Sequence, residues 1–211
     1  MNTKQVCTRC IYDSSTPAIR FDEKGICNYC RMIDQLQDEY KTGTKEGEDR
    51  FLKIVENIKA NGTGKKYDCV VGVSGRTDSS YMLYKLVRVY GLRPLAVHYD
   101  NTWNSAIATE NIRKILSALN VDLCTHVLDN KESDDLFKSF FLAGVPELDG
   151  PTDIGCPEFL YRACAKYGIK YVIEGHSFRS EGVSPLGSMY IDGKYIQSVH
   201  EQFGTVPIQT F

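Results

Sequence analysis

Residues 67–80 read YDCVVGVSGRTDSS, and the prediction of the fold starts from this stretch. The apolar run up to Val73 ends in Ser74-Gly75, which is typical of a buried parallel strand, and a helical pattern runs from Asp78 to Tyr90. The alternation continues, with strands expected at 94–99, 122–128 and 171–175 and helices at 106–119, 132–143 and 157–167. Strands that alternate with helices of about 10–15 residues indicate βαβ units, so we predict an α/β fold with a doubly wound parallel sheet.

The flanking segments suggest how the chain is divided. Helical spacing of apolar residues predicts helices at 31–41 and 51–62, joined by a polar, glycine-containing linker at 42–50. Near the end, MYIDGKYI (189–196) is predicted to be a hairpin turning at Asp192-Gly193. We therefore expect a small module of residues 1–41 and a larger domain of residues 50–211.

The composition excludes several classes of protein. Hydrophobic residues make up 42% of the 211 residues and charged residues 25%, which fits a globular chain and not a disordered one or a coiled coil. No apolar run approaches the ~20 residues of a membrane span, and the N-terminus lacks the apolar segment of a signal peptide. We therefore expect a cytoplasmic protein with no membrane partner. The formal net charge of -2 gives no sign of a nucleic-acid partner.

Four of the eight cysteines form two pairs near the N-terminus, Cys7-x-x-Cys10 and Cys27-x-x-Cys30, with 16 residues between them. This spacing is typical of a tetrahedral site with four sulfur ligands that holds zinc and has a structural role. An iron–sulfur cluster has the same ligand geometry and stays an alternative.

The carboxyl ends of the strands are where a ligand binds in a sheet of this kind. Residues 74–80 follow the first strand and open a helix, so a glycine turn and a helix N-terminus would meet an anion there. Serine hydroxyls would add donors, and Asp78 would hold a magnesium ion, since a carboxylate repels phosphate. The alternative is a plain Ser/Gly turn in which Asp78 only caps the helix.

The loop resembles the Ser-Gly-Gly-x-Asp-Ser signature of the PP-loop ATP pyrophosphatases, with Arg76 in place of the second glycine. Further stretches extend the resemblance over nearly the whole chain: the cysteine pairs, PLAVHYDNTWN (94–104), PTDIG (151–155), YGIKYVIEGH (167–176) and SEGVSPLG (180–187). Together they are similar to the N-acetyl sugar amidotransferases of bacterial surface-polysaccharide and lipopolysaccharide biosynthesis. Members of that family usually extend well beyond this length, so we expect a C-terminally truncated form.

The resemblance implies an adenine nucleotide alpha hydrolase-like sheet and an ATP-dependent ligase that forms AMP and pyrophosphate. It implies that the acetamido group of a nucleotide-linked sugar becomes an acetamidine, with ATP, Mg2+ and Zn2+ as cofactors. Ammonia would come from a partner glutaminase through a synthase-like subunit. Asp78 and His176 are the expected catalytic residues. The expected nucleotide-binding residues are Ser74, Gly75, Arg76, Thr77, Ser79, Ser80, Asp100 and Gly175.

Two other functions stay open. Some PP-loop proteins with cysteine pairs are tRNA thiolases, for which Cys156 and Cys164 would be sulfur carriers. However, the Asp-Asp-containing stretch usual after the Gly-His of the last strand is replaced here by SFRSEG (177–182). The second function that stays open is that of a non-catalytic nucleotide-binding module. Within 177–182, Arg179 and Glu181 are candidates for holding substrate or metal.

Several residues have ordinary structural interpretations. We expect structural roles for His98, His126 and His200 and core positions for Cys69 and Cys124. Asp153 is expected to cap a helix.

Position 76 is the clearest departure from the resembled motif. A left-handed backbone there would cost a non-glycine residue about 1–2 kcal/mol, and the side chain would occupy space meant for phosphate. A guanidinium is also the best bidentate phosphate ligand among side chains. We expect impairment, so Arg76→Gly should tighten ATP binding by about tenfold or more.

Overall fold

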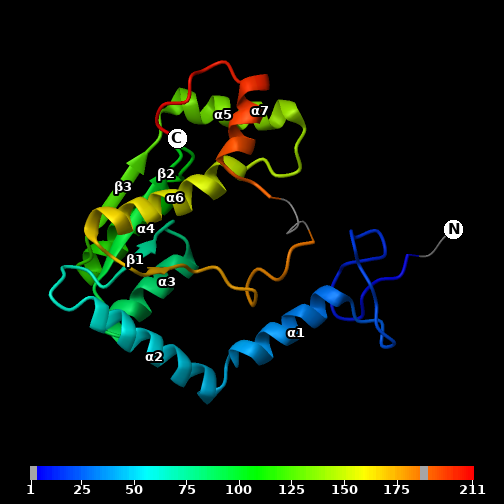
Figure 1. Cartoon of the computed structure of the whole chain (residues 1–211), viewed down its shortest axis with the longest axis horizontal. Helices are drawn as coiled ribbons and strands as arrows, with labels where there is room; N and C mark the ends of the chain where they lie inside the picture. Colours follow the sequence, from blue (N-terminus) through cyan, green and yellow to red (C-terminus); the bar gives the residue numbers. More distant parts are fainter. Residues whose placement is uncertain (1–3, 186–189) are drawn as a thin grey trace. The chain divides into compact units, whose positions relative to one another are not determined.

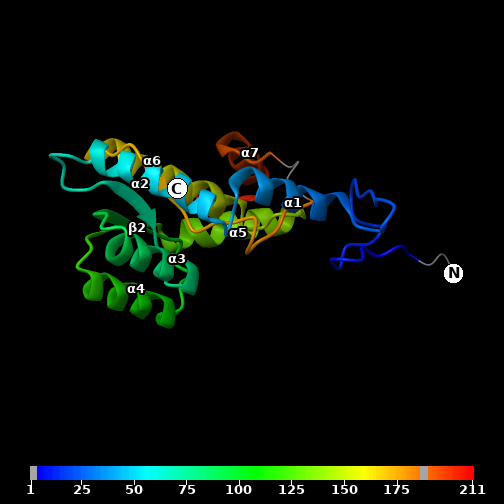
Figure 2. The same cartoon turned by 90° about the horizontal axis from the view of Figure 1, so that it is seen from below.

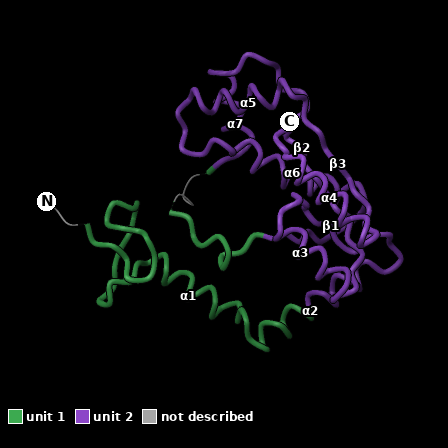
Figure 3. The backbone as a smooth tube through the Cα atoms, turned by 180° about the vertical axis from the view of Figure 1, so that it is seen from behind, with its two compact units in different colours: residues 1–53, 176–190 green, residues 54–175, 191–211 purple. Residues whose placement is uncertain are grey.

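The computed structural model describes residues 4–185 and 190–211 (Figure 1). The chain forms two compact units, one of residues 1–53 with 176–190 and one of residues 54–175 with 191–211 (Figure 3). Residues 176–190 thus belong to the unit that contains the four N-terminal cysteines.

The larger unit is built on a parallel four-stranded sheet, which confirms the predicted α/β class. Its strands are β1 (Cys69–Gly72), β2 (Pro94–Asp100), β3 (Leu123–Val127) and β4 (Val172–Ile173), in the order β3-β2-β1-β4. All three pairings are parallel, with Val71 of β1 opposite Ala96 of β2 and Ile173 of β4. The chain therefore winds outward from β1 in both directions.

Helices cover both faces of this sheet. Figure 2 shows α3 (Thr77–Tyr84) and α4 (Ala106–Leu119) on one side of the strands and α6 (Gly150–Tyr167) on the other. A π-helical turn, η1 (Lys85–Val89), continues α3. The core beneath α6 joins Leu160 and Ala163 to Val70, Leu95 and Val97 of the two central strands. The burial of β1 and of most of β2 explains the continuous apolar runs of these two strands in the sequence.

Two further helices, α5 (Asn130–Ala143) and α7 (Gly193–Phe203), pack against each other (Figure 1). Ile196 and Val199 of α7 are buried with Leu136 and Phe140 of α5. Local signals fix the start of each helix, because the side chains of Asp129 and Asp192 accept backbone N–H groups of the first turns.

The smaller unit contains the cysteine pairs, α1 (Asn28–Tyr40) and the first part of α2 (Lys45–Asn61). The prediction of a linker at 42–50 is wrong from residue 45 onward, because α2 begins at Lys45. The helix starts early because Glu46 and Glu48 lie in its first turn, where acidic side chains interact favourably with the helix dipole.

Two predictions near the C-terminal half are also wrong. Asp192-Gly193 does not turn a hairpin: Asp192 is the N-cap of α7 and accepts the backbone N–H of Tyr195 at 2.8 Å. Residue 189 of the expected hairpin lies outside the described residues. Asp153 does not cap a helix, because α6 already begins at Gly150 and places Asp153 in its first turn. In the described parts of the chain, no helix is long and apolar enough to span a membrane.

Candidate functional site

The loop of residues 73–76 leaves β1 at a topological switch point. From β1 the chain passes through α3 to β2 on one side, whereas β4 pairs with β1 on the other. Loops at such a point splay apart, which opens a crevice for a ligand at the carboxyl ends of the strands. The larger unit therefore holds the Ser74–Ser80 segment where a parallel sheet binds its ligand.

Gly75 is required at its position. Its φ of +74° lies in the left-handed region, and a Cβ there would stand 2.2 Å from the carbonyl oxygen of Ala108. The carbonyl of Gly75 also accepts a hydrogen bond from Asn111 Nδ2 at 3.1 Å. Helix α4 thus holds the loop backbone in place. The sequence did not reveal this contact, because Ala108 and Asn111 carry no motif of their own.

Ser74 and Ser79 are the first and last residues of the Ser-Gly-Gly-x-Asp-Ser motif, and they differ in exposure to solvent. Ser79 is buried, and its hydroxyl accepts the backbone N–H of Ser74 and donates to the carbonyl of Arg76, both at 3.3 Å. Ser74 is exposed, with its own hydroxyl 3.3 Å from that of Ser79. Ser79 therefore shapes the loop from inside, whereas Ser74 can also face a ligand.

Arg76 has an ordinary backbone conformation. As the N-cap of α3 it has φ of −85° and ψ of 169°, so the left-handed strain considered for this position does not arise. The side chain is exposed and makes no capping hydrogen bond. The first helical bond joins Ser80 N–H to the carbonyl of Arg76, so the N–H groups of Thr77 and Asp78 have no partner within the helix. These donors and the guanidinium suit an anion.

Asp100 ends β2 and organises the turn that follows. Its Oδ1 accepts Thr102 N–H at 2.8 Å and Asn104 Nδ2 at 2.7 Å, and Thr102 has a positive φ of 70°. Beside it, buried His98 lies 2.8 Å through Nδ1 from the carbonyl of Val73. The structural role expected of His98 is thus specific, since it links the carboxyl ends of β1 and β2. In the sequence, the signal for the role of His98 was the alternation of side chains along a strand, which puts residues 98 and 100 on the same face of β2.

The rest of this turn is held by α5 and α6. The carbonyl of Asn101 accepts the Ser133 hydroxyl at 2.7 Å, and its amide donates to the Thr152 hydroxyl at 3.1 Å. Trp103 is 60% exposed and donates from Nε1 to Asp134 at 3.1 Å. Its indole ring is stacked on Phe137 at 4.5 Å. The turn after β2 is thereby fixed.

Gly175 and His176 belong to different units. The backbone position of Gly175 brings it beside α3, because an added Cβ would lie 3.9 Å from Asp78. Asp78 and Gly175 are therefore neighbours in the larger unit. His176 belongs to the unit of the cysteines, so its catalytic role stays a prediction.

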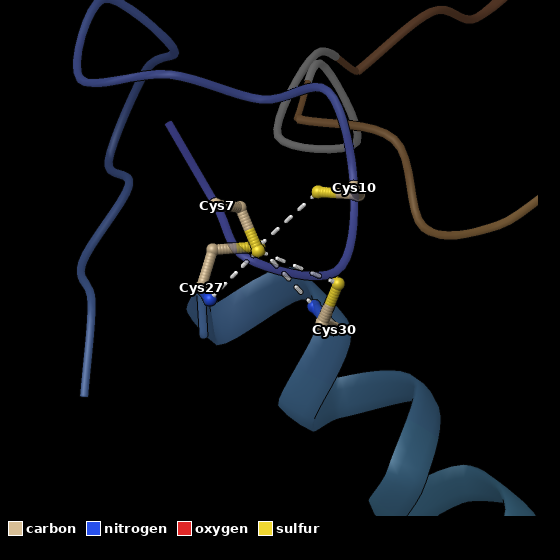
Figure 4. Close-up of side chains that lie close together, drawn as sticks. All are labelled: Cys7, Cys10, Cys27 and Cys30. Atoms are coloured by element: carbon tan, nitrogen blue, oxygen red, sulfur yellow. Dashed lines mark hydrogen bonds between the residues drawn. The ribbon is translucent and has the colours of Figure 1, made fainter. Parts of the chain in front are cut away.

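The four cysteines of the smaller unit converge (Figure 4). Their sulfur atoms all lie within 4.8 Å of one another, with Cys7 and Cys30 3.9 Å apart and Cys10 and Cys27 3.7 Å apart. A tetrahedral zinc site with Zn–S bonds of about 2.3 Å has sulfur atoms about 3.8 Å apart. The ligand set fits zinc in number, chemistry and spacing.

Backbone groups prepare this cluster for negative charge. Burial raises the pKa of the Cys7 thiol, but N–H groups of Arg9 and Cys27, at 3.4 and 3.2 Å from its sulfur, outweigh burial and hold that pKa at about 6. For Cys10 and Cys30, burial together with the thiols of Cys7 and Cys27 raises the pKa. Four thiolates therefore need a bound cation, which a divalent metal supplies.

Comparisons with known proteins give few relatives. No protein-family model matches the chain. An uncharacterized protein of Methanocaldococcus jannaschii is 29% identical over 171 residues, which is 81% of this chain. The chain spans 58% of the length of that relative.

Among solved structures, the chain is similar to the ammonia-dependent NAD synthetase of Campylobacter jejuni, with a TM-score of 0.45 and 16% identity over 71% of this chain and 70% of that one. It is similar to the NMN synthetase of Francisella tularensis, with a TM-score of 0.43 and 15% identity over 74% and 70% of the two chains. A glutamine-dependent NAD+ synthetase of Acinetobacter baumannii gives a TM-score of 0.45 and 15% identity, over 68% of this chain and 30% of that one.

Proposed function

We propose that the chain is an ATP-dependent amidotransferase that converts the acetamido group of a nucleotide-linked N-acetyl sugar into an acetamidine. The observation that carries the proposal is the Ser74–Ser80 loop, which is held on α4 at the switch point and opens the N-terminus of α3. The choice of an acetamido sugar is supported by the resemblance of the surrounding sequence to the N-acetyl sugar amidotransferases.

The first step would activate an amide oxygen, which is otherwise a very poor leaving group. The acetamido oxygen attacks the α-phosphorus of ATP, and pyrophosphate departs with the electrons of the broken P–O bond. Negative charge develops on that pyrophosphate, where the N–H groups of Thr77 and Asp78, the Ser74 hydroxyl and the Arg76 guanidinium would receive it. Fixed donors of this kind stabilise the transition state because they need no reorganisation.

The second step would exchange oxygen for nitrogen. Ammonia attacks the imidate carbon, the C–O bond breaks, and AMP leaves with the former acetamido oxygen. Loss of a proton then gives the acetamidine. Because ammonium is not a nucleophile, ammonia from a partner glutaminase, delivered through a synthase-like subunit, would be the efficient source.

Asp78 and His176 have distinct proposed roles. Asp78 is exposed in the first turn of α3 and adjoins Gly175, so its carboxylate would hold the Mg2+ that accompanies ATP. That ion neutralises phosphate charge when bound. His176 would act in proton transfer during the ammonia step.

Product analysis tests the proposal. The purified chain is incubated with ATP, Mg2+, ammonium salt and nucleotide-linked acetamido sugars, and AMP and pyrophosphate should form only when the sugar is present. Asp78→Asn should lower this rate by on the order of a hundredfold or more, whereas exposed Glu56→Gln should leave it unchanged. AMP formation that depends on tRNA would show a thiolase instead. Nucleotide binding without turnover would show a binding module.

The source of ammonia gives a separate check. Ammonium salts should support the reaction alone, and glutamine should support it only after a glutaminase is added. Efficient use of glutamine by the isolated chain would contradict the proposed division of labour.

A further inference from the structure

The residues that follow Gly175 along the chain pack on the cysteine cluster. Val183 lies against the group formed by Cys7, Cys27, Tyr29 and Cys30. The ring of Phe178 lies 6.2 Å from that of Tyr40, at the end of α1, the helix that the second cysteine pair opens. Segment 177–183 therefore has its apolar contacts in the unit of the cysteines.

This segment also has internal order. The N–H of Glu181 donates to the carbonyl of Ser177 at 2.9 Å, and that of Gly182 donates to the carbonyl of Phe178 at 3.1 Å. Gly182 has a positive φ of 76°, which ends the turn before Val183. One helical turn alone is not stable in water, so its order depends on the contact of Val183 with the cysteine cluster and on that of Phe178 with Tyr40.

Three of the four buried residues in the cluster beneath Val183 are cysteines. Its buried members are Cys7, Cys27, Tyr29 and Cys30, with Tyr12, Ile19, Phe21 and Ile26 partly buried around them. The four sulfur atoms lie within 4.8 Å of one another, so a metal ion bound to all four would hold the two cysteine pairs together. Losing the cation would therefore loosen the surface on which Val183 lies.

We propose that metal bound at the four cysteines orders residues 177–183, the segment that continues from Gly175-His176. The centre then has a second role besides folding residues 4–30. Its consequence for catalysis rests on the proposed function, because Arg179 and Glu181 are exposed on the ordered segment and follow the predicted catalytic histidine. The ordering itself does not depend on that function.

Hydrogen exchange measured by mass spectrometry on the full chain tests the proposal without nucleotide or turnover. Zinc-loaded protein is compared with protein treated with a chelator. The amides of Glu181 and Gly182 should exchange on the order of tenfold faster after zinc removal, whereas those of α4 should not change. Equal protection of 177–183 in the two states, while residues 7–30 lose protection, would overturn the proposal.

A substitution separates the contact from the metal. Val183→Ser keeps all four cysteines, so it should retain zinc while the exchange of Glu181 and Gly182 accelerates. Leu148→Ser, at an exposed apolar position in the other unit, is the control and should change neither. Unchanged exchange in Val183→Ser would contradict the proposed anchor even if chelation unfolds more of the chain. Because no step involves ATP, failure of the amidotransferase proposal would leave this result intact.

Discussion

At Gly75, backbone conformation and packing both exclude a side chain. The φ of +74° disfavours L-residues, and the nearest atoms to an added Cβ belong to the backbone of Ala108, which cannot rotate away. A substitution there must strain the loop or shift α4. The geometry of the loop at 73–76 thus depends on the absence of a Cβ at Gly75.

We expect Gly75→Ala to destabilise the protein more than Gly64→Ala. Gly64 has a similar φ of +77° but nothing within 4 Å of the added Cβ, so it incurs only the left-handed cost of about 1–2 kcal/mol. The clash at Gly75 should add about 1–3 kcal/mol, as overpacking does in cores. Urea unfolding of both variants measures the difference. Equal losses of unfolding free energy would mean that α4 moves aside freely.

At Arg76 the structure removes one of the two costs expected from the motif. The extended backbone carries no left-handed strain for glycine to relieve, and the guanidinium is exposed. Without that strain, we predict instead that Arg76→Gly weakens ATP·Mg binding by on the order of tenfold, the size of one charge-assisted hydrogen bond. Arg76→Lys should fall between the two. Calorimetric titration decides the sign: tighter binding by the glycine form would show that the side chain blocks the phosphates.

Among the elements, the cysteine module gives a direct metal prediction. Purified protein should hold about one zinc per chain, because four converging thiolates complete one tetrahedral site. Cys27→Ser should lose this zinc, whereas Cys164→Ser, in α6, should keep it. Elemental analysis measures both. Iron with a visible charge-transfer band, or an unchanged zinc content in Cys27→Ser, would rule out the zinc site.

Helix α5 holds the C-terminal residues through two buried carboxylates. Glu132 accepts N–H groups of Thr210 and Phe211 at 2.8 and 2.7 Å, and Asp135 accepts that of Thr205 at 2.7 Å. Burial raises the pKa of each carboxyl, but these hydrogen bonds outweigh burial and leave both pKa values below their usual range. The contacts therefore require ionised carboxylates.

This arrangement predicts stability that is lost in acid. A depressed folded-state pKa contributes stability that is present above the ordinary pKa of about 4 and disappears as the pH falls toward the folded value. Glu132→Gln should therefore cost about 2 kcal/mol or more at about pH 7 and much less at about pH 3. Urea unfolding at both values measures this. A cost independent of pH would show that the charge of Glu132 is not what holds the C-terminal residues.

The elements that the sequence predicted well are those with a continuous pattern. The apolar runs of β1 and β2 and the caps of α4 determine those elements locally. The sequence Asp192-Gly193 is equally compatible with a hairpin turn and with a helix N-cap. The helix forms because it buries Ile196 against α5. The motif likewise located the loop at 74–80, but not its contact with Ala108 or the link from His98, since these depend on distant residues.

At the scale of the whole molecule, the larger unit carries the loop that we propose to bind ATP, and the unit of the cysteines carries residues 176–190. In the proposed reaction, the acetamido oxygen forms a bond to the α-phosphorus of ATP. An oxygen isotope can follow this one bond.

The most direct test is to label the acetamido oxygen of the sugar substrate with heavy oxygen. The reaction is run with ATP, Mg2+ and ammonium, and the AMP is examined by mass spectrometry. The label should appear in the phosphate of AMP in proportion to the acetamidine formed. AMP without the label, alongside acetamidine formation, would contradict adenylation of the amide oxygen.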